Sequence, residues 1–171
     1  MKTAILVISF GTSHRDTLEK TIGAVEKKLK YEFKTDVFRA FTSGMIIKKL
    51  RERDGIEIDT VDEALEKLYK SGYTDIFCVP THIMCGIEYD KACRMIEKFN
   101  DKMKIRISRP LVTETSDYYN IVDIFKHRLN RQKQTLRFYG TRQRPFCECR
   151  LPALDYHFKN SRYEQRICRY C

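Results

Sequence analysis

The segment Ser9-Phe10-Gly11-Thr12-Ser13 contains residues that could bind an anion. It joins an apolar, strand-like run to the start of an expected helix, where free backbone N–H groups and small hydroxyl groups favour a carboxylate or a phosphate. A structural role is the alternative, because Thr12 or Ser13 could simply cap the following helix. The segment lacks the glycine spacing of dinucleotide-binding and Walker loops, so the sequence does not support nucleotide binding.

His82 is the second candidate, since it closely follows an apolar run that ends at Pro80. An imidazole can transfer protons or bind a metal ion near neutral pH. Glu88 could add a second polar group to the same site, or it could serve only as a first-turn acid of a helix. A hydrogen-bonded structural histidine is the alternative for His82, and the residues themselves leave both roles open.

Four of the seven cysteines lie near the carboxyl terminus and could form a zinc site. They are Cys147, Cys149, Cys168 and Cys171. Residues 126–171 also hold 12 Lys and Arg residues against 3 Asp and Glu residues, whereas residues 1–125 are nearly balanced, with 21 against 20. Four thiolates in a basic segment would suit a zinc-dependent nucleic-acid module. The spacing argues against this interpretation, because a Cys-x-Cys pair is less typical of zinc sites than Cys-x-x-Cys.

The candidate residues lie between segments that alternate between strand and helix patterns. Strands are expected at residues 4–10, 36–40, 75–80, 104–108 and 135–139, and helices at 16–30, 45–53, 61–70, 88–100 and 116–131. This alternation predicts an α/β fold with a parallel four-stranded sheet flanked by helices, similar to one flavodoxin-like lobe, followed by an irregular extension. The carboxyl ends of the strands would then bring residues 11–14, 42–44 and 80–86 to one edge of the sheet.

Length and composition exclude several functional classes. A chain of 171 residues with 42% hydrophobic and 33% charged residues can bury one core. It has no apolar run approaching the roughly 18 residues that span a membrane, and no signal peptide is expected at its amino terminus. Without such a signal the cysteines are expected to be reduced thiols or metal ligands instead of disulfides, and we expect a cytoplasmic protein.

Residues from Met1 to about Arg137 resemble the anaerobic-type sirohydrochlorin cobalt chelatases of vitamin B12 synthesis. The strings that carry the resemblance are Ala4-Ile5-Leu6-Val7-Ile8-Ser9-Phe10-Gly11-Thr12-Ser13, Arg39-Ala40-Phe41-Thr42-Ser43-Gly44-Met45-Ile46, Pro80-Thr81-His82-Ile83, Glu88-Tyr89-Asp90 and Arg109-Pro110-Leu111. The resemblance implies two similar α/β lobes with the tetrapyrrole and the metal ion in the cleft between them. Residues 1–130 would form the first lobe, and residues 131–171 would be an incomplete, poorly ordered start of the second.

The resemblance also implies which residues bind the substrate. Ser9, Gly11, Thr12, Ser13 and His82 would line the first-lobe side of the tetrapyrrole site. Cobalt would be a substrate rather than a tightly bound cofactor, and this chain would supply no metal ligand of its own. We expect sirohydrochlorin as the partner molecule and neither a nucleic acid nor a membrane. Self-association is expected through the apolar face that would otherwise contact the second lobe.

The second-lobe metal ligands of the family have no counterpart in this chain. The family has Gly-His-Gly after the first strand of that lobe, whereas this sequence has Tyr139-Gly140-Thr141-Arg142. Permissible codons for residues 138–150, read one nucleotide later, can spell Phe-Met-Gly-His-Gly-Arg-Asp-Arg-Ser-Ala-Asn-Ala-Val. We therefore expect the open reading frame to leave the family's frame near Phe138, to return near Leu151 and to leave again near Glu164. Such a chain would have little or no cobalt-inserting activity alone.

Overall fold

The computed structural model of the chain describes residues 2–132. The chain divides into two compact units, Met1–Leu111 and Val112–Cys171, which are described separately below. The strand expected at 135–139, the four cysteines of the zinc interpretation and the expected changes of reading frame all lie outside the described residues. In the described part of the chain, no helix is both long enough and apolar enough to cross a membrane.

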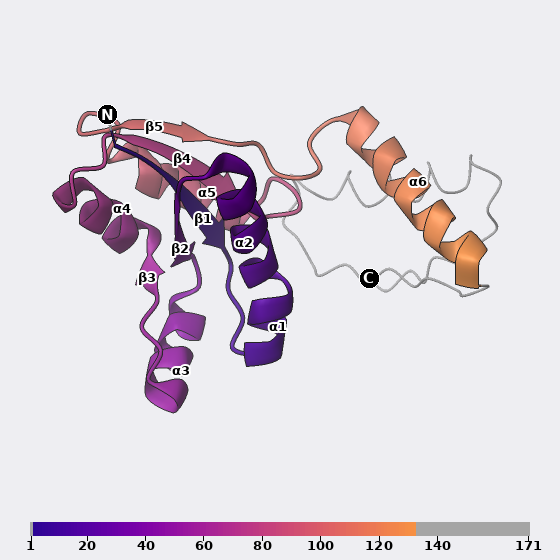
Figure 1. Cartoon of the computed structure of the whole chain (residues 1–171), viewed down its shortest axis with the longest axis horizontal. Helices are drawn as coiled ribbons and strands as arrows, with labels where there is room; N and C mark the ends of the chain where they lie inside the picture. The colour runs from indigo at the N-terminus through magenta and orange to yellow at the C-terminus, as the bar shows by residue number, and fades with distance from the viewer. Residues whose placement is uncertain (1, 133–171) are drawn as a thin grey trace. The chain divides into compact units, whose positions relative to one another are not determined.

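Strands and helices alternate along the first unit (Figure 1). The strands are β1 (Thr3–Ser9), β2 (Asp36–Phe41), β3 (Asp59–Thr60), β4 (Asp75–Pro80) and β5 (Lys104–Ile107). The helices are α1 (Arg15–Lys20), α2 (Ile22–Phe33), α3 (Gly44–Asp54), α4 (Val61–Lys70) and α5 (Ile87–Glu97). The described part of the second unit contains α6 (Thr115–Gln132).

All five strands belong to one parallel sheet with the order β3-β2-β1-β4-β5. The central strand β1 is buried from Ala4 to Ser9, as expected for an apolar run that is covered on both faces. Its Val7 aligns with Arg39 of β2 and with Val79 of β4. The predicted α/β fold with a parallel sheet is thus confirmed.

The sheet has five strands instead of the expected four. The additional strand β3 is only two residues long and pairs with Ala40 and Phe41 at the end of β2. Two residues are too few to show the alternation of a strand, so no periodic signal in the sequence reveals this element. Its second residue, Thr60, is also the N-cap of α4, so the local sequence predicts the start of that helix instead of a strand.

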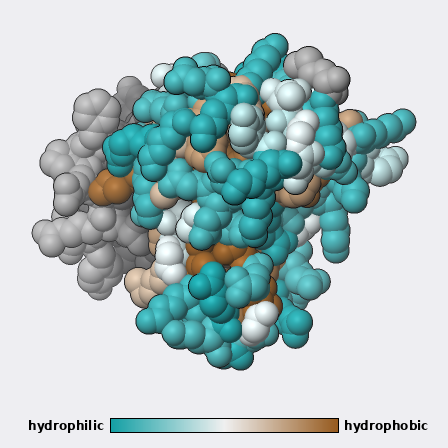
Figure 2. Space-filling model, turned by 90° about the vertical axis from the view of Figure 1, so that its left-hand side faces the viewer, coloured by the Kyte–Doolittle hydropathy of each residue, from teal (hydrophilic) through white to brown (hydrophobic). Residues whose placement is uncertain are grey.

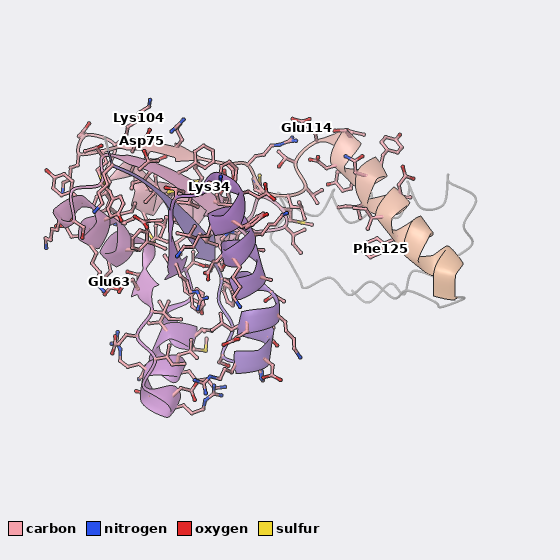
Figure 3. All side chains as sticks on the ribbon, in the orientation of Figure 1. Lys34, Glu63, Asp75, Lys104, Glu114 and Phe125 are labelled. Atoms are coloured by element: carbon pink, nitrogen blue, oxygen red, sulfur yellow. The ribbon has the colours of Figure 1, made fainter. Side chains whose placement is uncertain are left out.

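Thr60 and Glu63 have the spacing that predicts a capping box, and the structure has this box at the start of α4. The Thr60 hydroxyl accepts a hydrogen bond from the Glu63 N–H at 3.3 Å, and the Glu63 carboxylate accepts one from the Thr60 N–H at 2.8 Å. These bonds from the Thr60 backbone and side chain hold the pKa of Glu63 below its usual value. Figure 3 shows Glu63 at the beginning of this helix. The cap therefore fixes where α4 leaves the edge of the sheet.

Two clusters of buried side chains hold the layers together. The larger cluster joins one face of the sheet to α4 and α5, and its most deeply buried members include Leu6, Ile8, Val61, Leu65, Ile76 and Ala92. The smaller cluster gathers Phe41 with residues of α1, α2 and α3, namely Leu18, Ile22, Ile47 and Leu50, and with Ile58. Figure 2 shows the side of the molecule over α3 and α4, where hydrophilic colour predominates and hydrophobic colour is confined mainly to a central band. Apolar burial therefore fixes the layers that support the loops.

The single helix expected at residues 16–30 is interrupted at Thr21. This residue has a φ of −114° and a ψ of −81°, and its hydroxyl donates a hydrogen bond to the Thr17 carbonyl at 2.6 Å. Such a bond to the preceding turn competes with regular helix geometry. The apolar spacing continues from Leu18 through Ile22 across the break, which explains why the sequence predicts one helix instead of α1 and α2.

In the second unit, α6 agrees with the helix expected at residues 116–131. Asp117 stabilises its start, because this carboxylate accepts hydrogen bonds from the N–H groups of Thr113 and Glu114, both at 2.9 Å. Acceptors at this position satisfy backbone donors that have no partner within the helix itself.

Candidate functional site

Hydrogen bonds tie together the loops at the carboxyl edge of the sheet. The N–H groups of Thr42 and Ser43 donate to the carbonyls of Ser9 and Phe10, at 2.9 and 3.3 Å. On the other side of β1, the Thr81 hydroxyl donates to the Ser9 hydroxyl at 2.8 Å. Ser9 is itself only 1% exposed, so its hydroxyl joins the β1 and β4 loops instead of facing open solvent. The three loops expected at this edge are therefore brought together.

Gly11 allows the chain to turn away from β1. Its φ is +99°, a conformation that side chains with a Cβ rarely adopt. A Cβ added there would lie 2.5 Å from Cδ2 of the Phe41 ring. Since Phe41 is fully buried, the ring has little freedom to move away. Gly11 is therefore required both by the backbone conformation and by the close approach of the neighbouring loop.

Thr12 and Ser13 are part of this turn, and neither is the N-cap of α1. The Thr12 hydroxyl accepts a hydrogen bond from the His14 N–H at 3.2 Å, and His14 occupies the N-cap position without a capping side-chain bond. The Ser13 carbonyl accepts a hydrogen bond from Arg53 of α3 at 2.5 Å. The loop is thus fixed from two sides before it enters a helix of only six residues.

His82 lies at the same edge, with both ring nitrogens buried and without a hydrogen-bond partner in the described part of the chain. Its ring meets the Tyr89 ring edge to face, with the centroids 6.3 Å apart. Burial lowers the pKa of His82 below 6.5, and the nearby Glu88 carboxylate opposes this effect only in part. The imidazole is therefore neutral at pH 7 and can accept a proton or donate a lone pair.

Glu88, Lys91 and Thr42 continue this polar cluster beyond His82. Lys91 donates a hydrogen bond to the Thr42 carbonyl at 2.5 Å, and its Nζ lies 4.0 Å from Oε2 of Glu88. Oε2 of Glu88 and Oγ1 of Thr42 are buried and have no hydrogen-bond partner among the described residues. The sequence alone does not identify Lys91 as a site residue, although its position three residues after Glu88 on one helix face is a usable signal.

Large exposed hydrophobic side chains occupy the loops and helix starts at this edge. They range from 48% to 80% exposed and follow four of the five strands: Phe10, Met45, Ile83, Ile87 and Leu111. Apolar side chains around a few polar groups are typical of sites for flat organic ligands. The carboxyl edge thus combines these five side chains, which we call the apolar margin, with buried polar atoms that have no hydrogen-bond partner among the described residues. These orphaned polar atoms belong to Thr42, His82 and Glu88.

The opposite edge of the sheet has satisfied polar groups. Asp75 is buried and accepts hydrogen bonds from Arg106 at 2.9 and 3.0 Å. Figure 3 shows Asp75 near Lys104, its register partner, where β4 and β5 begin. Tyr73 donates to Asp36 at 2.7 Å at the same edge. Buried polar atoms without partners therefore mark the carboxyl edge specifically, within residues 2–125.

The described cysteines do not form a metal site. Cys78 and Cys93 are free thiols, and burial raises the pKa of Cys78 to about 12, as expected for a core residue. Within residues 2–125, no three His, Cys, Asp or Glu side chains are grouped so that they could hold a metal ion.

Comparison with known proteins identifies the family. The model of the cobalt chelatase (CbiK) family matches residues 3–168. The chain belongs to the cobalt chelatase family. The sirohydrochlorin cobaltochelatase of Salmonella typhimurium is 38% identical over 171 residues, a match that covers 98% of this chain and 65% of that protein. The chain thus spans less than two thirds of the length of this curated chelatase.

A solved structure has a fold similar to that of this chain. A cobalamin (vitamin B12) biosynthesis CbiX protein from Marinobacter aquaeolei matches with a TM-score of 0.54 and 16% identity, covering 78% of this chain and 100% of that one. At this identity the similarity concerns the fold alone. The family match extends to residue 168, through most of the cysteine-rich segment, and so favours a chelatase over the zinc-dependent nucleic-acid module.

His82→Gln is expected to flatten the dependence of stability on pH. Because the folded protein holds the pKa of His82 below the unfolded value of 6.5, the neutral ring contributes stability above that value, and this stability is lost as the pH falls through the folded pKa. Urea unfolding at about pH 7.5 and about pH 5.5 should show a smaller loss in the variant than in the parent chain. His14→Gln, at an exposed position, is the matched control. An equal loss in the parent and in His82→Gln would contradict the assignment.

Proposed function

We propose that this cobalt chelatase family member acts in the insertion of Co²⁺ into sirohydrochlorin, and that the carboxyl edge of its sheet holds one side of the tetrapyrrole. The Salmonella relative supplies the identity of the substrate. The observation that ties the reaction to this edge is the orphaned, neutral imidazole of His82 inside an apolar margin.

The loop residues have separate roles in this proposal. Gly11 lets the backbone approach the ligand, and Thr12 and Ser13 border it from the same loop. Ser9 supports the site through its hydrogen bond to Thr81, because its own hydroxyl is buried. His82 faces the ligand from the β4 loop, where exposed side chains such as Ile83 contact the macrocycle.

The reaction replaces two pyrrole protons by one divalent cation without any change of oxidation state, and in this proposal His82 accepts one proton while water accepts the other. A base that is neutral before it accepts the proton does not repel Co²⁺, and it therefore allows the cation to approach. The neutral ring of His82 meets this requirement at pH 7. Glu88 stabilises the protonated ring, because its carboxylate favours the charged form of His82.

Cobalt is a substrate in this scheme, and we propose no tightly bound cofactor, nucleic acid or membrane as a partner. We also propose a cytoplasmic location, which the free thiols of Cys78 and Cys93 support. The exposed apolar margin supports self-association of the chain when no tetrapyrrole is bound.

Titration with sirohydrochlorin tests this proposal. Changes in the visible absorbance of the tetrapyrrole report binding, because the side chains of the protein do not absorb visible light. Saturable binding is expected, and Ile83→Asp should weaken it about tenfold by removing an apolar contact and adding a repelling charge. Tyr31→Asp, which changes an exposed aromatic residue on α2, is the control. No saturable binding, or equal weakening by both variants, would contradict the proposal.

A further inference from the structure

Lys91 reaches the carboxyl edge from the second turn of α5. Its ammonium group donates a hydrogen bond to the carbonyl of Thr42, in the loop that follows β2, at 2.5 Å. The side chain is 38% exposed, so it is held by the protein but remains accessible from solvent. Because Thr42 is buried and tied to Ser9, this contact fixes the positive charge beside the loops of the proposed site.

The Lys91 ammonium group can donate more hydrogen bonds than the one that it makes to Thr42. A lysine can donate three hydrogen bonds, and among residues 2–125 Lys91 donates one, to Thr42. The Glu88 carboxylate lies 4.0 Å away, which is an ion-pair contact but too long for a hydrogen bond. Lys91 can therefore bind a further oxygen acceptor without giving up its anchor on Thr42.

We propose that Lys91 is a substrate-binding residue that recognises a carboxylate group of the tetrapyrrole. The inference rests on the proposed function and deepens it, because it names the chemical group that is recognised and the residue that recognises it. An ammonium group paired with a carboxylate makes a charge-assisted hydrogen bond. The apolar side chains of Ile83 and Ile87 at the same edge would exclude water and strengthen this attraction.

The hydrogen bond to Thr42 also lowers the entropic cost of binding a carboxylate to Lys91. A free lysine side chain loses rotamer freedom when it binds, whereas a side chain that is already held by a hydrogen bond loses less. Lys98, at the end of the same helix, differs in this respect. It is exposed and pairs with Asp62 at 3.2 Å, away from the β2 loop. The two lysines therefore carry the same charge on the same helix but only Lys91 is positioned at the site.

The test compares sirohydrochlorin with its octamethyl ester, which has the same macrocycle but no carboxylate. Both are titrated into the full chain in the same buffer and cosolvent, with Lys91→Met, Lys91→Arg and Lys98→Met beside the parent chain. Lys91→Met should weaken binding of the acid about tenfold and change binding of the ester less than twofold. Lys91→Arg should restore part of the affinity for the acid, and Lys98→Met should bind both ligands like the parent chain.

Each result distinguishes the two proposals. Equal weakening of acid and ester by Lys91→Met would show that Lys91 only holds the Thr42 loop, and would overturn the inference while leaving the proposed function intact. Unchanged acid binding in Lys91→Met, or the same loss in Lys98→Met, would also overturn it. If the parent chain binds neither ligand, the proposed function fails, and the role of Lys91 fails with it.

Discussion

Gly11→Ala is expected to destabilise the protein by about 3 kcal/mol, since it combines backbone strain with overpacking. The φ of +99° at this position is unfavourable for alanine, and the new Cβ would lie 2.5 Å from a ring carbon of Phe41. Phe41 belongs to the cluster that holds α1, α2 and α3, so a shift of its ring would disturb packing well beyond the loop. Urea or thermal unfolding followed by circular dichroism measures the change.

Gly44→Ala is the matched control for this prediction. Gly44 is the first residue of α3, has no atom within 4 Å of an added Cβ, and is not among the glycines with positive φ. The same chemical change should therefore alter stability by less than about 0.5 kcal/mol. In the double variant Gly11→Ala/Phe41→Leu, the smaller side chain should recover part of the loss, because the clash is removed while the strain remains. Similar stabilities of the two alanine variants would contradict this account.

The 171-residue chain is expected to insert cobalt about a hundredfold or more slowly than the Salmonella relative. The reason is chemical: the family resemblance implies a metal-binding imidazole in a Gly-His-Gly segment, this sequence has Tyr139-Gly140-Thr141-Arg142 at that position, and we therefore expect that ligand to be missing. His82 can accept a proton, but one neutral ring does not replace a set of cobalt ligands. An anaerobic assay with sirohydrochlorin and Co²⁺, followed by the change in the visible spectrum, measures both rates.

A variant of the same chain provides the comparison for this rate. In it, residues 138–150 are replaced by Phe-Met-Gly-His-Gly-Arg-Asp-Arg-Ser-Ala-Asn-Ala-Val, which permissible codons for these residues can spell when read one nucleotide later. Restoring the imidazole should raise the rate of insertion, whereas changing its histidine to alanine should remove the gain. Ordinary turnover by the unchanged chain would show that the missing histidine is not needed. Sequencing of the encoding DNA around codon 138 tests the expected change of frame directly.

Several features could be predicted because neighbouring residues encode them. The apolar run of β1 and the capping box of Thr60 with Glu63 are local patterns, and each has the predicted structure. The carboxyl edge could also be predicted, since the order of parallel strands determines where their following loops meet. Two local features differ from the prediction. Thr21 interrupts an otherwise continuous helical pattern, and β3 is too short to show a period.

The sequence by itself determined the family, the parallel α/β fold and the loops that carry Gly11 and His82, because spacing and short motifs are properties of consecutive residues. Only the tertiary structure decided how these loops are joined. Lys91 donates to a carbonyl 49 positions away, and the ring of Phe41 closes over Gly11 from another strand. Such contacts depend on which strands lie side by side, and no local pattern records that arrangement. The same holds for the orphaned imidazole of His82, whose burial comes from the packing of the surrounding elements.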